Sequence, residues 1–327
     1  MQKSQSTVHI FGPASLSNLG PGFDALGLCI RGIGDIVEAQ FSERPGVHLE
    51  HDPGIVGWVL PADPRKNTAV VAAEGVMKLL DPDRGILFRL RKGIPLGSGI
   101  GGSAASAVAG AWAVNVLFGC PLEKEALIEA VLDAEDMASG GRHGDNALPA
   151  LLGGLVLVSS SNPSRYRRIE LPSKLPIAII LPDVEVLTKQ AREMLPKTVA
   201  LKDAVHNASE LAFMVDAYRS GDWETVGRCM MQDRLVEPVR AQLVPCYHAV
   251  RHAAMEAGAF GCALTGSGPA MFALAPSDEV AAQICDAMVE ASLAAGIGAR
   301  GVVTATNEEG VAVMAESSVE SLLPVGR

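Results

Sequence analysis

The sequence has few aromatic residues, no run of basic residues and no hydrophobic segment long enough to span a membrane. Phe, Trp and Tyr make up 4% of the 327 residues, which disfavours a platform for stacking nucleic-acid bases. Lys and Arg number 27 against 37 Asp and Glu, giving a formal charge of −10, so we expect no broad binding to nucleic acid or anionic membranes. The most apolar segment, 104–118, is shorter than the roughly 20 residues of a membrane span and predicts a buried helix.

The sequence also lacks paired cysteines and an apolar leader. Its six cysteines form no C-x-x-C pair, which is typical of reduced thiols in a core. Residues 1–7 have no apolar signal-peptide segment, so we expect a cytoplasmic protein. Hydrophobic residues at 48% and charged residues at 20% are ample for folded domains, and the length suggests about two of them.

Hydrophobic patterning divides the chain into short strands and amphipathic helices. Three early alternating segments with few helices between them favour an antiparallel, α+β arrangement over a doubly wound sheet. The Ser-rich stretch 159–164 is the most linker-like, so we place two domains at 1–165 and 166–327. Strands are expected at 8–11, 35–41, 47–49, 86–90, 151–159, 177–181, 262–265, 271–275, 301–306 and 311–315. Helices are expected at 67–80, 103–118, 122–138, 188–195, 203–219, 222–236, 241–257 and 277–295.

A glycine-rich loop at residues 95–105, P-L-G-S-G-I-G-G-S-A-A, is the most informative stretch. Its glycines leave backbone N–H groups unshielded, and the helix that follows directs the positive end of its dipole at the loop, so the segment predicts a phosphate site. Taken alone, the loop fits a tight turn that enters a packed helix as well as it fits a phosphate site. The expected contacts are Pro95, Gly97, Ser98, Gly99, Ile100, Gly101, Gly102 and Ser103.

Three common nucleotide-binding patterns do not fit this loop. Gly97, Gly99 and Gly102 satisfy G-x-G-x-x-G, but two helices follow instead of the strand with an acidic end that a dinucleotide fold needs. No Lys precedes Ser103, as a Walker motif requires. Neither H-R-D nor D-F-G occurs in the chain, which disfavours a protein kinase.

Further motifs accompany the loop. They are P-A-S-L-S-N-L-G-P-G-F-D at 13–24, A-L-T-G-S-G-P-A at 263–270, H-G-D-N at 143–146 and T-K-Q-A-R-E-M-L-P at 188–196. In this order, over residues 8–275, the set resembles the GHMP small-molecule kinases, and within them the branch that acts on an amino acid alcohol. The resemblance implies an N-terminal domain like ribosomal protein S5 domain 2, a C-terminal ferredoxin-like domain and an active site between them.

The resemblance implies ATP on the loop 97–103 and Mg²⁺ held by Ser103 and Glu135, in keeping with the few hard oxygen ligands that Mg²⁺ prefers. On pattern alone, Glu135 reads as a solvated acid. Many relatives have Ser-Ser where this chain has Gly102-Ser103, which removes one hydroxyl. Asn67 and Lys92 match positions near the nucleotide, although Asn67 could equally be a helix cap and Lys92 a surface residue.

The implied acceptor is L-homoserine, phosphorylated on its hydroxyl to supply threonine synthesis. Arg192 and Arg240 would hold its carboxylate and Asp24 its ammonium, because a zwitterion needs both charges matched. Asn18, His143 and Asn146 are expected around its side chain and hydroxyl, and the backbone at Gly266, in the 263–270 motif, is expected close to the phosphates or the substrate. The competing interpretations are a turn for Asn18 and Asp24 and solvated helix positions for the two arginines.

Phosphoryl transfer needs positioning and charge neutralisation more than covalent chemistry. By resemblance, Asn146 and Thr188 lie near the reacting centre. Asp145 is a candidate base, or else a helix cap or a support for His143; in the alternative, the γ-phosphate takes the proton itself. Two other functions stay open, namely a GHMP kinase for another small alcohol and a catalytically inactive regulatory paralogue. Because homodimers are common in the family, we expect one here.

Overall fold

The computed structural model describes residues 7–51 and 63–318. Its first sheet contains β1 (Val8–Ser17), β2 (Leu26–Ser42), β3 (Gly46–His51), β4 (Gly85–Arg91), β5 (Leu155–Ser159), β6 (Asn162–Ile169) and β11 (Ala312–Met314). The order is β11-β1-β2-β4-β3, and β5 pairs with β2 and with β6. The expected antiparallel pairing is confirmed for β1, β2 and β4, but β3 runs parallel to β4. The parallel pairing is possible because a helical crossover joins those two strands.

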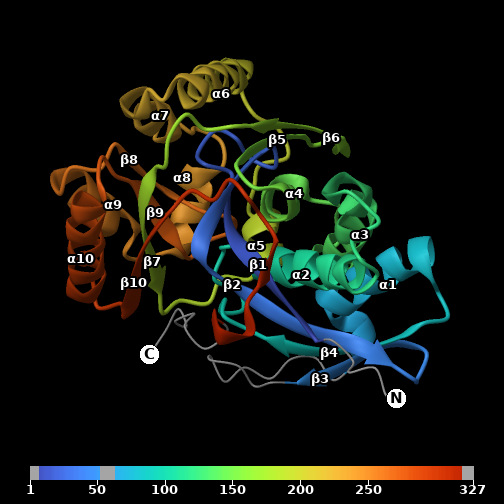
Figure 1. The fold of residues 1–327 in the computed structure, drawn as a ribbon. Coiled ribbons are helices and arrows are strands. Elements are labelled where there is room, and N and C mark those ends of the chain that lie inside the picture. The colour runs from blue at the N-terminus through green and yellow to red at the C-terminus, as the bar shows by residue number, and fades with distance from the viewer. Residues whose placement is uncertain (1–6, 52–62, 319–327) are drawn as a thin grey trace.

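Four helices lie together against this sheet (Figure 1). They are α1 (Thr68–Leu80), α2 (Gly102–Leu117), α3 (Ile128–Ser139) and α4 (Gly144–Leu152). The expected helix at 122–138 is partly wrong, because the chain forms a 3₁₀ turn, η2, at Lys124–Leu127 and becomes α-helical only at Ile128. Gly140, with a φ of 73°, ends α3 in the left-handed conformation that glycine adopts without strain.

The second sheet has the order β10-β7-β9-β8, with every neighbouring pair antiparallel. Its strands are β7 (Pro176–Pro182), β8 (Gly261–Leu264), β9 (Met271–Leu274) and β10 (Ala299–Ala305). Between β7 and β8 come α5 (Thr188–Glu193), α6 (Leu201–Ser220), α7 (Trp223–Met230), α8 (Glu237–Arg240) and α9 (Tyr247–Glu256), and α10 (Asp278–Ala294) lies between β9 and β10. This β-α-β-β-α-β order is that of a ferredoxin-like domain, as expected.

Several expected boundaries are wrong. The helix expected at 222–236 ends at Met230, and α8 follows it unpredicted. The range expected as one helix at 241–257 begins with the 3₁₀ turn η3 (Ala241–Leu243) and is α-helical only over α9. The strand expected from residue 151 begins only at Leu155, because the residues before it end α4, which the pattern did not predict.

The Ser-rich stretch 159–164 is the end of a hairpin and not a linker, with a two-residue turn at 160–161 between the last residue of β5 and the first of β6. The first sheet therefore extends past residue 165 to Ile169. It also includes β11, a strand from near the end of the described residues, which pairs with β1. Division into two domains near residue 165 stays a prediction.

Three groups of buried apolar side chains form the core. One lies among α1–α4 and the first sheet, and a second lies among the second sheet, α9 and α10. The third joins the two halves, since Leu16 and Leu19 from the first share it with Ala263 and Phe272 from the second. The turn after β1 and the turn after β8 are therefore held against each other, and that junction is where the site forms.

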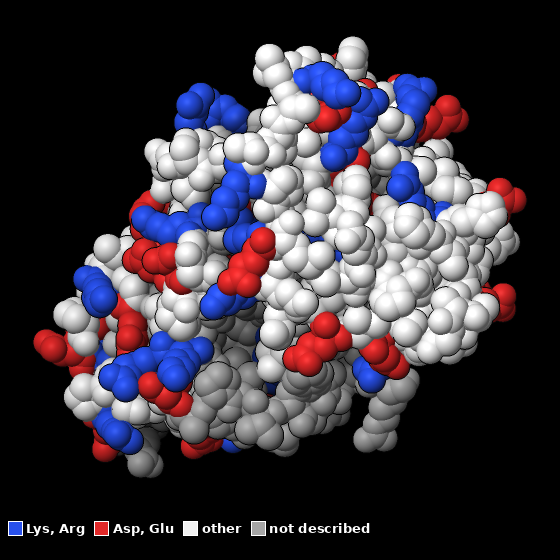
Figure 2. Space-filling view, turned by 180° about the vertical axis from the view of Figure 1, so that it is seen from behind, with Lys and Arg blue, Asp and Glu red and all other residues white. Residues whose placement is uncertain are grey.

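On the face seen in Figure 2, acidic and basic side chains are interspersed on one half, and a broad neutral area covers much of the other. Within residues 7–51 and 63–318, no helix combines the length and apolarity needed to cross a membrane.

Candidate functional site

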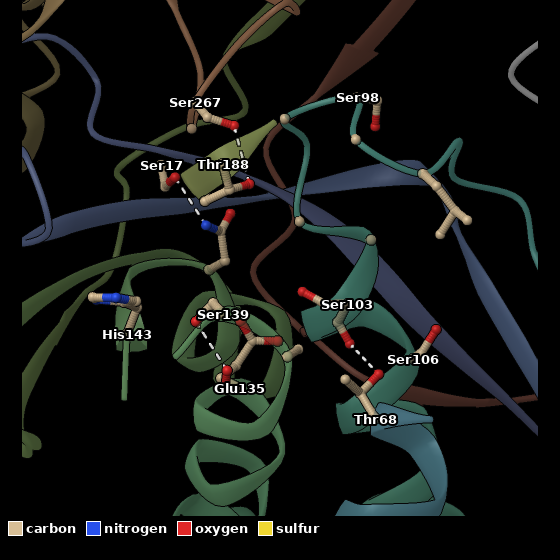
Figure 3. Close-up of a pocket in the computed structure, with 18 of the residues that line it drawn as sticks. Ser17, Thr68, Ser98, Ser103, Ser106, Glu135, Ser139, His143, Thr188 and Ser267 are labelled. Atoms are coloured by element: carbon tan, nitrogen blue, oxygen red, sulfur yellow. Dashed lines mark hydrogen bonds between the residues drawn. The ribbon is translucent and has the colours of Figure 1, made fainter. Parts of the chain in front are cut away.

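A cleft of about 400 Å³ runs along the junction of the two halves and collects residues from all the motifs (Figure 3). Its lining includes every site residue expected from the sequence except Ile100, whose side chain is buried in the core that joins the halves. The expected residues that line it are Asn18, Asp24, Asn67, Lys92, Pro95, Gly97, Ser98, Gly99, Gly101, Gly102, Ser103, Glu135, His143, Asp145, Asn146, Thr188, Arg192, Arg240 and Gly266.

The glycine loop forms one wall of the cleft and ends at the N-terminus of α2. Gly101 caps that helix in the left-handed conformation, and a Cβ there would lie 2.4 Å from the Ser15 hydroxyl, so only glycine fits. No side chain caps the first turn of α2, which leaves its backbone N–H groups able to bind an anion. Ser103, in that first turn, is exposed to the cleft.

Three hydrogen bonds cross between the halves at the 263–270 motif, two to the glycine loop and one to the end of β1. The Thr265 hydroxyl donates to the Gly99 carbonyl at 3.1 Å and accepts from the backbone N–H of Ser17 at 3.0 Å. The backbone N–H of Ala270 donates to the Ser98 carbonyl at 3.2 Å. The turn after β8 thus fixes the position of the glycine loop relative to the end of β1.

Beneath the loop lies a buried ion pair that the sequence did not predict. The Lys92 ammonium contacts the Asp35 carboxylate and donates to Gly102 O and Ser106 Oγ, each at 3.0 Å. Asp35 also accepts from Ser106 Oγ at 2.6 Å and from the backbone N–H groups of Gly93 and Ile94. The surface interpretation of Lys92 is wrong, since it is 4% exposed, and its bonds brace the start of α2.

Asn67 serves as a helix cap. Its Oδ1 accepts from the backbone N–H of Ala69 at 3.0 Å at the start of α1, while the residue also lines the cleft. The helix-cap interpretation is therefore confirmed, and contact with a nucleotide stays a prediction.

Glu135 projects from α3 into the cleft close to Ser103. Its side chain is buried, so the interpretation as a solvated acid is wrong. Burial raises the pKa of its carboxyl to about 7, against the lowering effect of a hydrogen bond from Ser103. Oxygen Oε1 is buried without a hydrogen-bond partner. An orphaned carboxylate oxygen beside a hydroxyl and open space fits a hard divalent cation that completes its shell with water and phosphate.

The N-terminus of α4 presents the next group of polar side chains. Asn146 accepts from Ser15 Oγ at 3.0 Å and donates to Ser17 Oγ at 2.9 Å, which fixes its amide orientation. Burial raises the pKa of Asp145 to about 6, with Asp24 acting in the same direction and a hydrogen bond from Ser17 opposing. The pKa of His143 is lowered by partial burial and by Arg192.

The other end of the cleft is strongly charged. Arg192 on α5 makes a two-pronged ion pair with Asp24, with both N–O distances 2.9 Å. Arg240 on α8 is 3% exposed and donates to the Gly266 carbonyl at 2.7 Å, and its Nε has no partner. Both guanidinium groups lie about 5 Å from the ring of Phe23, at 5.4 and 5.0 Å. Neither arginine is merely a solvated helix residue, so that interpretation is wrong.

The 13–24 motif folds around the charged end of the cleft. Asn18 has a φ of 73° and donates to the same Gly266 carbonyl at 2.8 Å, while its Oδ1 accepts from the Asp24 backbone N–H. Both Asn18 and Asp24 are therefore turn residues, as the competing interpretation held, and they line the cleft as well. Thr188 lies nearby, with its hydroxyl 3.4 Å from that of Ser267.

Comparison with known proteins agrees with this geometry. The family model for the GHMP kinase N-terminal domain matches residues 67–154, and that for the C-terminal domain matches residues 213–294. The chain belongs to the GHMP kinase family. This GHMP kinase is 42% identical to a homoserine kinase from Pyrococcus furiosus over 90% of its own length and 96% of that protein. It is 37% identical to a homoserine kinase from Chlorobaculum tepidum over 88% and 91% of the two chains.

Solved structures show the same relationship. A homoserine kinase from Cytophaga hutchinsonii superposes with a TM-score of 0.90 at 39% identity, covering 96% of this chain and 99% of that one. An L. major mevalonate kinase, solved with R-mevalonate, superposes with a TM-score of 0.71 at 19% identity, which shows a shared fold alone. The expected two-domain GHMP fold is thus confirmed.

Sequence reasoning missed several residues that shape the site, among them Asp35, Ser106, Ser17, Phe23 and Thr265. Only Asp35 had a usable signal. It shares the inward face of an alternating strand with Val37 and Ala39, and a charge at such a position demands a buried partner.

Proposed function

We propose that this GHMP kinase transfers the γ-phosphate of ATP to the hydroxyl of L-homoserine, giving O-phospho-L-homoserine. The observation that carries the proposal is the zwitterion-matched end of the cleft. The guanidinium groups of Arg192 and Arg240 and the carboxylate of Asp24 line the same cavity as the Asn146 amide and the glycine loop. The homoserine kinase relatives, at about 40% identity over most of the chain, support the same substrate.

ATP would bind with its phosphates on the loop 97–103, where the N–H groups at the start of α2 offer hydrogen bonds to anionic oxygens. Ser103 and Glu135 would hold Mg²⁺, and the orphaned Oε1 atom is the feature that fits it. When bound, this ion supplies charge neutralisation for the phosphoryl group. The buried Lys92–Asp35 pair holds the loop in shape from beneath.

The acceptor would replace the ion pair between Asp24 and Arg192 with ion pairs to its own ammonium and carboxylate. Its carboxylate would lie against Arg192 and Arg240, and its ammonium against Asp24. Arg240 supports this because it is buried without any acidic partner among the described residues. A carboxylate would supply the missing counter-charge. Such ion pairs are of no use to a neutral sugar.

The acceptor hydroxyl would be oriented by Asn146 and Thr188. Asn146 has a fixed amide, because Ser15 and Ser17 engage its oxygen and nitrogen. Asp145 would take the hydroxyl proton, and its pKa of about 6 leaves it mostly ionised at neutral pH while keeping it a useful base. In the alternative, the γ-phosphate takes this proton and Asp145 only tunes the local charge.

Acceptor analogues test the zwitterion directly. ADP release should be fast with L-homoserine and at least roughly 10-fold less efficient with 3-aminopropan-1-ol, which lacks the carboxylate, because a charged hydrogen bond is lost. It should fall similarly with 4-hydroxybutanoate, which lacks the ammonium. Equal efficiency with all three compounds would contradict the proposed roles of Arg192, Arg240 and Asp24.

The expected homodimer stays a prediction.

A further inference from the structure

Arg240 is carried by an unusually short element. Helix α8 has only four residues, Glu237–Arg240, too few to hold its own shape without outside contacts. The Arg240 side chain has one hydrogen bond, to Gly266 O, and an unpartnered Nε. The position of its guanidinium therefore depends on the groups that fix α8 from behind.

The turn leading into α8 is fixed by Asp233. Its two carboxylate oxygens accept backbone N–H groups from Leu235, Val236 and Glu237 at 2.7 to 3.3 Å. The side-chain amide of Asn207, on α6, adds a further hydrogen bond at 2.7 Å. Asp233 thus determines where the backbone of α8 begins, but it does not determine how the helix is rotated against its neighbours.

Glu237, the first residue of α8, supplies that restraint. The hydroxyl of Tyr247, on α9, donates to its Oε1 at 2.6 Å. Tyr247 packs in the same buried cluster as Leu264, which ends β8 two residues before Gly266. Glu237 therefore joins α8 to α9, and through Tyr247 to the buried cluster at the end of the strand that leads to Gly266.

The arrangement behind α8 is built for a carboxylate. Arg251 donates to the Tyr247 hydroxyl at 3.0 Å and to the Met231 carbonyl at 3.1 Å, so the hydroxyl that donates to Glu237 is itself held in place. Glu237 is 8% exposed and does not line the main cleft; it lines a separate cavity of about 160 Å³. Its carboxylate cannot reach an acceptor in the main cleft, so any effect on the acceptor must pass through α8.

We propose that Glu237 is a positioning residue that sets the guanidinium of Arg240 for the acceptor carboxylate. The inference rests on the proposed function and adds a residue outside the cleft to its specificity. The Glu237 carboxylate holds α8 to Tyr247, Tyr247 packs in one cluster with the end of β8, and the turn after β8 holds Arg240 through Gly266. Loosening one connection therefore moves the guanidinium relative to the backbone that it contacts.

Glu237→Gln is the sharpest variant, because Gln keeps the size and one acceptor oxygen but removes the charge that strengthens the hydrogen bond from the Tyr247 hydroxyl. We expect kcat/KM for L-homoserine to fall roughly 10-fold through KM, with kcat and the KM for ATP nearly unchanged. Tyr247→Phe, which removes a single hydroxyl, should give a smaller loss of the same kind and serves if the first variant folds poorly.

Glu308→Gln is the matched control, since Glu308 is another partly buried carboxyl with a raised pKa but is paired to Arg168 away from the cleft. It should leave the homoserine parameters unchanged. In an Arg240→Ala background, Glu237→Gln should cause no further loss in kcat/KM for homoserine, because its effect acts through that guanidinium.

The outcomes separate this inference from the proposed function. If the wild type yields no phosphorylated homoserine, the proposed function is wrong and this inference falls with it. If the wild type is active but Glu237→Gln keeps its KM for homoserine, only the inference is overturned. An equal rise in the KM for ATP, or full additivity with Arg240→Ala, also overturns it, since a merely structural role would produce either result.

Discussion

Replacing Lys92 with Met tests whether the buried ion pair under the glycine loop is a structural brace. The variant removes three hydrogen bonds from the Lys92 ammonium and leaves the fully buried carboxylate of Asp35 without a cation. Breaking a buried pair in this way costs about 3–5 kcal/mol. Asp35 keeps the Ser106 hydroxyl and two backbone donors, so we expect the lower end, about 3 kcal/mol.

Urea unfolding of the wild type and of Lys92→Met measures this cost directly. A loss of about 3 kcal/mol is a large part of the roughly 5–15 kcal/mol that stabilises a folded protein. The double variant Asp35→Asn, Lys92→Met removes both charges and should be more stable than Lys92→Met alone. If Lys92→Met instead lost less than about 1 kcal/mol and raised only the KM for ATP, Lys92 would be a nucleotide contact and the brace would be refuted.

Three further outcomes are expected. Arg192→Ala should lower affinity for L-homoserine by roughly 10–150-fold and leave ATP affinity near normal; an unchanged KM for homoserine would remove Arg192 from the site. Glu135→Ala should abolish turnover at ordinary Mg²⁺ concentrations, and undiminished activity across a Mg²⁺ titration would show that the metal lies elsewhere. Because burial raises the pKa of Asp145 from 3.8 to about 6, its stabilising protonated form is complete below about pH 4 and lost as the pH rises through 6. Asp145→Asn should therefore gain stability over the wild type between pH 4 and pH 7 in urea unfolding, on the order of 2 kcal/mol, and a constant difference would contradict the raised pKa.

Local patterns were enough to predict much of the fold. The spacing of apolar residues gave α1 at 67–80 to within a residue, because one face of that helix is buried. The glycine loop was equally informative, since positive φ values at Gly97, Gly99 and Gly101 require glycine whatever the rest of the chain does.

Features that depend on distant partners were not predictable. The last residues of helix α4 have the apolar pattern of a strand, and Pro149 inside the helix disfavours helix formation. The helix forms because it packs against β2 and β5. The strand β6 begins with Asn162-Pro163-Ser164, which is turn-like in composition, and is a strand only because β5 offers it a partner.

The interior of the site shows the same limit. Asp35 and Lys92 are 57 residues apart, and no local rule pairs them. The resemblance could bring Asp24 and Arg192 into one site, but it could not show that they bind each other when no acceptor is present. Their pairing is visible only once both halves of the chain are folded together.

The most direct test of the account is ³¹P NMR of the protein with Mg-ATP and L-homoserine, run beside L-threonine, mevalonate and shikimate. The account predicts a new phosphomonoester signal with L-homoserine and none of comparable rate with the other three alcohols. A phosphomonoester from one of those alcohols and none from L-homoserine would keep the kinase fold and contradict the zwitterion site. ATP binding without product from any of them would contradict catalysis itself.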